Sequence, residues 1–211
     1  MINNIDKIKP LLNFQDEGDF YMLYVFKRKK DQPKEESSNH QSVRTIKSYC
    51  IESIEQLEKR YEEIMLLCEV FKARAYIHVQ RQNHSDTSLD MIATLAQKIK
   101  DKQHNQKYLF DSVVGSLKTY EKRWIVDIDT HSLEFIGKVT KVITDCKPEG
   151  NKLEALIGTP SGAHLITKRF DVVEFKKHFP DIDIQKKNPT LLYYPNSLQN
   201  NDNEIRLKLI K

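Results

Sequence analysis

The sequence predicts an α+β protein, with a ferredoxin-like βαββαβ core in its C-terminal half and an α/β unit before it. Three observations lead to this prediction for the 211-residue chain. Short apolar runs typical of strands alternate with segments of helical period along the chain. The second half follows the order strand, helix, strand, strand, helix, strand. The turn at 159–162 (TPSG) joins two of these strands as a hairpin.

The N-terminal α/β unit is expected to span residues 1–120. Its predicted elements are strands at 20–26, 43–50 and 73–79 and helices at 52–72, 87–102 and 108–117. The polar segment 27–41, which begins KRKK and contains a proline, is expected to be a solvated loop. Four apolar residues at helical spacing are expected to face inward from the second helix, which Asp86 would cap: Leu89, Ile92, Leu95 and Ile99.

The βαββαβ core is expected to span residues 121–211 and to pack with the first unit as one globular body. Its predicted strands are at 124–128, 153–158, 163–167 and 190–194. One predicted helix begins at Ser132, and the other covers 171–178. The alternating segment 204–210 would add an edge strand.

Composition excludes several classes of protein. The three cysteines form no CxxC or CxxH pair, which argues against zinc fingers and a disulfide framework. No GxGxxG or GxxxxGK[ST] motif occurs, so a Rossmann site and a P-loop are disfavoured. No apolar run approaches the roughly 18–20 residues of a membrane span, and the N-terminus lacks the apolar core of a secretory signal. We therefore expect a cytoplasmic protein without a membrane partner; the net charge of +4 permits nucleic-acid binding without requiring it.

Two carboxylates mark the end of the predicted strand 124–128. Asp127 and Asp129 are two residues apart, so both side chains lie on one face of the strand. Carboxylates held together in this way repel each other unless a cation or hydrogen-bond donors neutralise them. Oxygen ligands of this kind suit Mg²⁺ or Mn²⁺, which also bind phosphate oxygens. The pair is therefore a candidate metal site with a catalytic role.

The predicted hairpin supplies candidate phosphate ligands. Ser161 offers a hydroxyl, Gly162 a backbone N–H group and His164 an imidazole. In a βαββαβ sheet the first and third strands are neighbours, which brings His164 close to the aspartates. Lys168 and Arg169 follow the hairpin and are candidates for contact with a triphosphate. Metal ligands facing phosphate donors are what phosphoryl or nucleotidyl transfer requires.

The stretch WIVDID, followed about 30 residues later by TPSGAHLIT, resembles the archaeo-eukaryotic primase superfamily, which includes primase-polymerases. The resemblance implies an RNA-recognition-like βαββαβ core preceded by an α/β unit, and a role in DNA replication. It implies that Asp127 and Asp129 bind Mg²⁺ or Mn²⁺ and that Ser161 and His164 bind the phosphates of an incoming nucleoside triphosphate. Single-stranded or primed nucleic acid would be the second substrate.

The chain departs from the family pattern at the third acidic motif. The strand predicted at 190–194 contains no aspartate, and Asp171, Asp181 and Asp183 do not follow a predicted hydrophobic strand. A catalytically degenerate protein of the same fold, which binds nucleic acid or another partner, is therefore the alternative.

Two further interpretations stay open. IVDIDT also looks like the opening of a haloacid dehalogenase-type phosphatase, but His131 stands where that family has threonine. In the strand 73–79, Arg74 and His78 share a face. They would line either a nucleic-acid groove or a strand edge in solvent.

Overall fold

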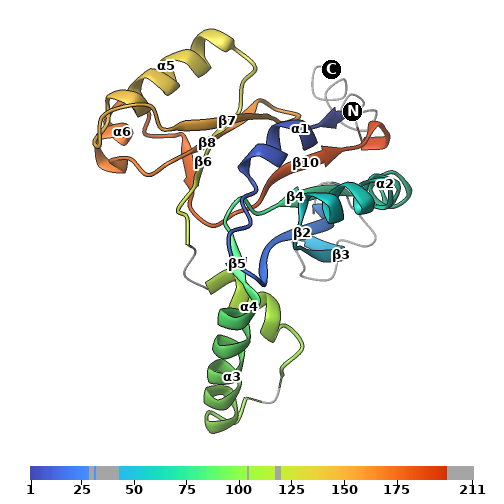
Figure 1. Cartoon of the computed structure of the whole chain (residues 1–211). Coiled ribbons are helices and arrows are strands. Elements are labelled where there is room, and N and C mark those ends of the chain that lie inside the picture. Colours follow the sequence, from blue (N-terminus) through green and yellow to red (C-terminus); the bar gives the residue numbers. More distant parts are fainter. Residues whose placement is uncertain (29–30, 32–42, 104, 117–119, 199–211) are drawn as a thin grey trace.

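The computed structural model describes residues 1–28, 31, 43–103, 105–116 and 120–198. In this part of the chain, two antiparallel sheets are combined with six α-helices and one 3-10 helix (Figure 1). The α+β class is therefore confirmed. The strand predicted at 204–210 and most of the loop predicted at 27–41 lie outside the described residues.

The larger sheet has six strands, in the order β1-β10-β4-β2-β3 with β5 paired to β2. They are β1 (Ile2–Asn3), β2 (Asp19–Arg28), β3 (Val43–Ile51), β4 (Arg74–Ile77), β5 (Gln82–Asn83) and β10 (Thr190–Tyr194). Along β2, Tyr21, Leu23 and Val25 are fully buried in the main hydrophobic cluster. Because successive side chains of a strand point to opposite faces, Arg28 leaves β2 on the other face.

The smaller sheet has the strand order β7-β8-β6-β9. Its strands are β6 (Trp124–Ile128), β7 (Leu153–Gly158), β8 (Ala163–Thr167) and β9 (Asp183–Gln185). One face packs on helices α5 (Leu133–Asp145) and α6 (Val172–His178), with Val126, Val139 and Phe175 fully buried in a second cluster. The opposite face carries Ile125 and Ile166 into the main cluster.

One predicted strand belongs to the other sheet. Residues 190–194 form β10, but β10 pairs with β4 and β1 of the larger sheet, and the three-residue β9 pairs with β6 instead. All five residues of β10 are buried, which suits a strand covered on both faces. The prediction that 190–194 completes the smaller sheet is wrong, because a three-residue edge strand carries almost no periodic signal.

The main hydrophobic cluster joins the two sheets. It combines residues of α1 (Ile5–Ile8), the 3-10 helix η1 (Lys9–Leu11) and α2 (Ile54–Phe71) with residues of both sheets. The buried Asn4 adds a polar connection: its Nδ2 donates to the Leu191 carbonyl of β10 (3.0 Å) and to the Gly158 carbonyl of β7 (2.9 Å). The division predicted at residue 120 stays a prediction, although β10 completes a sheet that otherwise comes from the first 120 residues.

Helices α3 (His84–Lys100) and α4 (Leu109–Ser116) project from the rest of the molecule (Figure 1). The cap of α3 is Asn83, whose side chain accepts from the Ser85 N–H group, and not Asp86 as predicted. Among the described residues, α3 is covered on the flank where Met91 and Leu95 pack on α4. Of the four residues predicted to face inward, Leu89, Ile92 and Ile99 are exposed. Among the described helices, none is long and apolar enough to cross a membrane.

Candidate functional site

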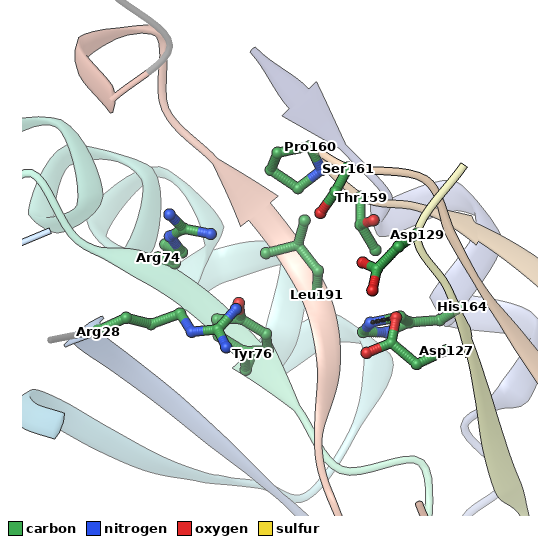
Figure 2. A pocket seen from close by; sticks show the side chains of 10 residues that line it. All are labelled: Arg28, Arg74, Tyr76, Asp127, Asp129, Thr159, Pro160, Ser161, His164 and Leu191. Carbon is green, nitrogen blue, oxygen red and sulfur yellow. Dashed lines mark ion pairs between the residues drawn. The ribbon is translucent and has the colours of Figure 1, made fainter. Parts of the chain in front are cut away.

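A cavity of about 290 Å³ lies between the two sheets. The larger sheet contributes Arg28, Arg74, Tyr76 and Leu191, whose side chains face those of the smaller sheet (Figure 2). The smaller sheet contributes Asp127, Asp129, His164 and the turn residues Thr159, Pro160 and Ser161. Four residues selected from the sequence, namely the two aspartates, Ser161 and His164, therefore line one cavity.

The register of the smaller sheet sets three of these groups side by side. Asp127 of β6 is paired with His164 of β8 on one side and with Asp183 of β9 on the other. Directly paired residues share a face, with Cβ atoms about 4.5–5.5 Å apart. Asp129, two residues beyond Asp127, also lies on this face. The result is a group of three carboxylates beside an imidazole.

Asp127 is at the centre of this group. Its burial raises the pKa of the carboxyl above the usual range, and the negative charges of Asp129 and Asp183 raise the pKa further. Arg28 acts in the opposite direction and lowers it. A carboxylate in this setting is stabilised by any cation that enters the cavity.

Asp183, which no predicted strand precedes, is a third carboxylate beside Asp127, although it is exposed and does not line the cavity. Gln185 Nε2 donates to Asp183 Oδ2 (3.0 Å) and to Asp127 Oδ2 (3.3 Å), which ties β9 to β6 through side chains as well as backbone. The signal that would have revealed it is the alternation of Asp183, Ile184 and Gln185, in which the apolar residue packs on the helix-covered side. Three residues are too few for that alternation to be distinguished from chance.

His164 is nearly buried and is held by both sheets. Its Nδ1 is 2.9 Å from Thr190 Oγ1 of β10, and its Nε2 is 3.5 Å from Asp127 Oδ1. Burial, assisted by the positive charge of Arg28, lowers the pKa of the imidazole to about 4. His164 is therefore neutral near pH 7. If Thr190 donates to Nδ1, the proton of the ring is on Nε2, on the side of the aspartates.

The turn between β7 and β8 presents Ser161 at the edge of the cavity. Ser161 is exposed, whereas Gly162 is buried directly against the end of β6. A Cβ atom on Gly162 would lie 2.0 Å from the carbonyl oxygen of Ile128 and 2.5 Å from the backbone nitrogen of Thr130. Gly162 is therefore not a lining residue. It is the residue that lets the Ser161 turn approach the aspartate-bearing segment.

The positive charge at the cavity comes from the larger sheet. Arg28 ends β2 and is exposed, whereas Arg74 is buried and makes a bidentate ion pair with Asp31 (2.7 Å for both bonds). Lys168 and Arg169 do not line the cavity. They follow Thr167, at the end of β8 that pairs with Trp124, one strand length from His164. From the sequence, Arg28 was expected in a loop, and Arg74 was expected either in a nucleic-acid groove or at a strand edge. The sequence does not show which residues of two different sheets face each other.

Carboxylate oxygens are the only anionic groups that line the cavity among the described residues. In the described part of the chain, no group of three or more His, Cys, Asp and Glu side chains is arranged so that it could hold a metal ion by itself. Mg²⁺ does not need such a cage, because it is usually held by one or two carboxylates together with waters and substrate phosphates. The carboxylates that line the cavity are the two of Asp127 and Asp129.

A scan against protein-family models and searches of curated proteins and of solved structures found no match to this chain.

Proposed function

We propose that the chain is a primase- or polymerase-like nucleotidyltransferase domain. The observation that carries this proposal is the cavity in which carboxylates of one sheet face arginines of the other. Carboxylates attract a divalent cation, and arginine, serine and a neutral histidine suit phosphate oxygens. A nucleoside triphosphate with its metal ion combines these two requirements.

In this proposal the side chains at the cavity have separate roles. Ser161 Oγ and the Nε2–H group of His164 donate to phosphate oxygens, and Arg28 offsets their negative charge. Asp127 and Asp129, with Asp183, would hold Mg²⁺ or Mn²⁺, which when bound neutralises charge on the triphosphate and activates the 3′-hydroxyl. The 3′-hydroxyl of a nucleic acid would lose its proton to solvent, its oxygen would bond to the α-phosphorus, and the bond from that phosphorus to the bridging oxygen would break, so that pyrophosphate leaves.

The strand order supports the same proposal at the level of the fold. The chain order β6-α5-β7-β8-α6-β9 with the spatial order β7-β8-β6-β9 is compatible with a ferredoxin-like, RNA-recognition-like core, which we propose. In this assignment β9 is the fourth strand, and Asp183 on β9 would be the third acidic position that resemblance to the primase superfamily calls for. In that case the chain has a third acidic residue, but this residue lies on β9 and not on the strand at 190–194.

The alternatives receive less support. A haloacid dehalogenase-type phosphatase would place its aspartate in a parallel sheet, whereas the described strand pairs are antiparallel. A protein of the same fold that only binds nucleic acid or another partner would not need three neighbouring carboxylates, because their repulsion disfavours binding of a polyanion.

The first test is thermal unfolding with and without Mn²⁺ plus a nucleoside triphosphate. Ligand at about 100 times its dissociation constant stabilises by roughly 2.7 kcal/mol, which for a chain of this size is a shift of about 5–10 °C in Tm. We expect the shift to require metal and triphosphate together. We expect Asp127→Asn to abolish it and to reduce template-dependent nucleotide incorporation by at least about 100-fold.

The matched control is Asp145→Asn, the same chemical change at an exposed residue at the end of α5. It should retain both the shift and incorporation. An unshifted wild-type Tm would contradict a nucleotide site. A shift without incorporation, together with metal-independent retention of nucleic acid, would favour the degenerate binding protein.

A further inference from the structure

Helix α3 carries an exposed apolar seam that belongs to none of the hydrophobic clusters of the described residues. The seam consists of Leu89, Ile92, Ala96 and Ile99, of which Ala96 is also exposed. The exposed fractions of the three large side chains are 65% for Leu89, 66% for Ile92 and 64% for Ile99. The flank that packs on α4 is a different one, formed by Met91 and Leu95. A contiguous apolar stripe of this kind usually marks an interaction site.

The spacing of the seam is that of a helix-pairing surface. Steps of three, four and three residues correspond to the a and d positions of two heptads. If a second copy of α3 runs antiparallel, Leu89 of one copy faces Ile99 of the other, and Ile92 faces Ala96. Each contact then occurs twice about a two-fold axis, so the seam is complementary to itself.

Charge on α3 favours the antiparallel direction. The first turn carries Asp86, and the last turn carries Lys100. Both lie on the same flank of the seam, at heptad positions that face each other in an antiparallel pair. Antiparallel pairing places Asp86 of each copy next to Lys100 of the other, and it also sets the two helix dipoles in opposite directions. Parallel pairing brings like charges to the same end.

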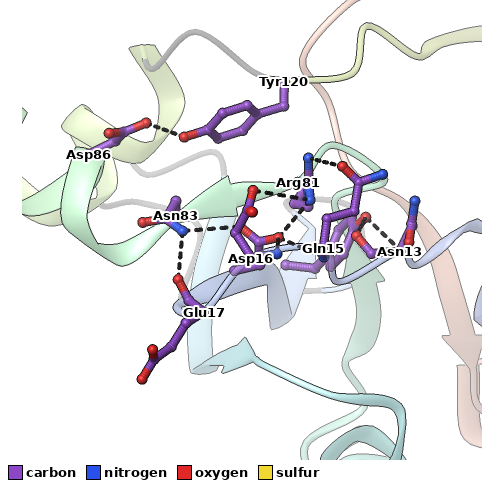
Figure 3. A network of polar contacts seen from close by, with 10 residues as sticks. Asn13, Gln15, Asp16, Glu17, Arg81, Asn83, Asp86 and Tyr120 are labelled. Carbon is purple, nitrogen blue, oxygen red and sulfur yellow. Dashed lines mark hydrogen bonds and ion pairs between the residues drawn. The ribbon is translucent and has the colours of Figure 1, made fainter.

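The base of α3 is fixed, so the seam is presented in a defined direction. The buried Asp19 accepts hydrogen bonds from Arg81 (2.6 Å) and from Asn83 (3.1 Å), the cap of α3. At the same base, Tyr120 donates to Asp86 (2.5 Å) (Figure 3). Because α3 projects away from both sheets (Figure 1), an antiparallel pair would hold the two bodies at opposite ends of the helices.

We infer that α3 is a dimerisation helix and that its occupant is α3 of a second copy of this chain. Two heptads form a small interface, in the class below about 1,200 Å² that is typical of weak or transient association. We expect a weak monomer–dimer equilibrium that depends on protein concentration.

Sedimentation velocity of the full chain over a range of concentrations tests this inference. Ile92→Glu buries a charge at the centre of the seam and should leave the chain monomeric at every concentration. The matched control is Val70→Glu, since Val70 is a similarly exposed (65%) apolar residue on α2; it should dimerise like the wild type. A monomeric wild type, or equal dimerisation of the wild type and Ile92→Glu, would overturn the inference.

A charge exchange tests the antiparallel direction. Asp86→Lys and Lys100→Glu should each weaken self-association several-fold, because each places like charges together twice. Mixed in equal amounts, the two variants should recover association as a heterodimer with both pairs restored. Asp86→Lys also removes the hydrogen bond from Tyr120. Thermal unfolding of each variant shows whether this loss lowers the stability of the monomer. A mixture no more associated than its components rules out antiparallel pairing through these residues.

Discussion

At Gly162 the backbone of the β7–β8 turn comes so close to the segment after β6 that no side chain fits. The contact is with backbone atoms of Ile128 and Thr130, which cannot turn aside as a flexible side chain would. Glycine is therefore required at position 162 because two chain segments pack closely there, and not because of its φ angle. The distance between Ser161 and the aspartates depends on it.

We expect Gly162→Ala to lower the free energy of unfolding by about 1–3 kcal/mol, the usual cost of overpacking. The comparison is Gly137→Ala in α5, where an added Cβ meets nothing within 4 Å and alanine should stabilise the helix by about 0.5–1 kcal/mol. Urea unfolding of both variants measures the two effects. Equal stabilities would contradict the close approach at Gly162.

His78 provides a pH-dependent contribution to stability. Burial lowers the pKa of its imidazole from 6.5 to about 4. The unfolded chain then binds a proton that the folded chain does not, so this contribution is complete above about pH 6.5 and is lost as the pH falls towards 4. Relative to His78→Phe, the wild type should lose up to about 1.4 kcal/mol per pH unit in this window.

Urea unfolding at several pH values checks this expectation, since the carboxylates titrate in both proteins and cancel in the difference. His178→Gln, at an exposed histidine of α6, serves as the control and should follow the wild type. A constant difference between the wild type and His78→Phe from pH 7 to pH 4 would show that His78 is protonated as readily in the folded chain.

At the scale of elements, two aspartates close in sequence lie in different structural settings. Asp171 caps α6, where its side chain accepts from the N–H groups of Val173 and Glu174. Asp183 lies on β9 next to Asp127. Helix α6 lies between them in sequence, and only the pairing of β9 with β6 brings Asp183 next to Asp127.

We therefore expect opposite results from Asp171→Ala and Asp183→Ala. Loss of the cap should lower the free energy of unfolding by about 1 kcal/mol and leave the Tm shift with Mn²⁺ and triphosphate intact. Loss of Asp183 should remove much of that shift with little loss of stability, since it relieves repulsion at Asp127. Thermal unfolding with and without ligands distinguishes the two. If both variants keep the full shift, Asp183 has no part in metal binding.

Sequence was informative where a pattern is long or local. The eighteen-residue α2 and the β6 strand with its aspartates follow from periodicity over several residues. The neighbourhood of Asp127 and His164 was predictable because it depends on strand order within one motif. Three features were not predictable. Strand β9 is too short to show a period, and β10 pairs in the larger sheet although it follows the smaller sheet in sequence. Arg28 reaches the cavity from a strand that is about 100 residues away from Asp127 in sequence. Each depends on long-range pairing, for which local periodicity carries no signal.

At the scale of the whole molecule, the two sheets share one hydrophobic cluster and should unfold together. The only tryptophan, Trp124, is in β6 of the smaller sheet, so its fluorescence reports on that sheet, whereas far-UV circular dichroism reports on the whole chain. We expect the two urea transitions to coincide, as in a single cooperative unit.

Asn4→Leu tests the connection between the sheets. It removes three hydrogen bonds of a buried side chain, including the one that Asn4 Oδ1 accepts from the Gly158 N–H group (3.2 Å), and leaves buried backbone groups unpaired. We expect a loss of about 2–4 kcal/mol that moves both transitions equally. Transitions that separate would indicate two independent units.

The pairing of β1 with β10 joins residues 2 and 194 in one sheet. During synthesis on a ribosome, β2 is available to pair with β4 as soon as β4 has been made. The other edge of β4 stays unpaired until β10 has been synthesised, near the end of the described chain. Contacts between such distant residues form late and slow the final step of folding. The nascent protein therefore exposes an open sheet edge for most of its translation, and cellular chaperones that shield such edges would have their main opportunity before residue 190 emerges.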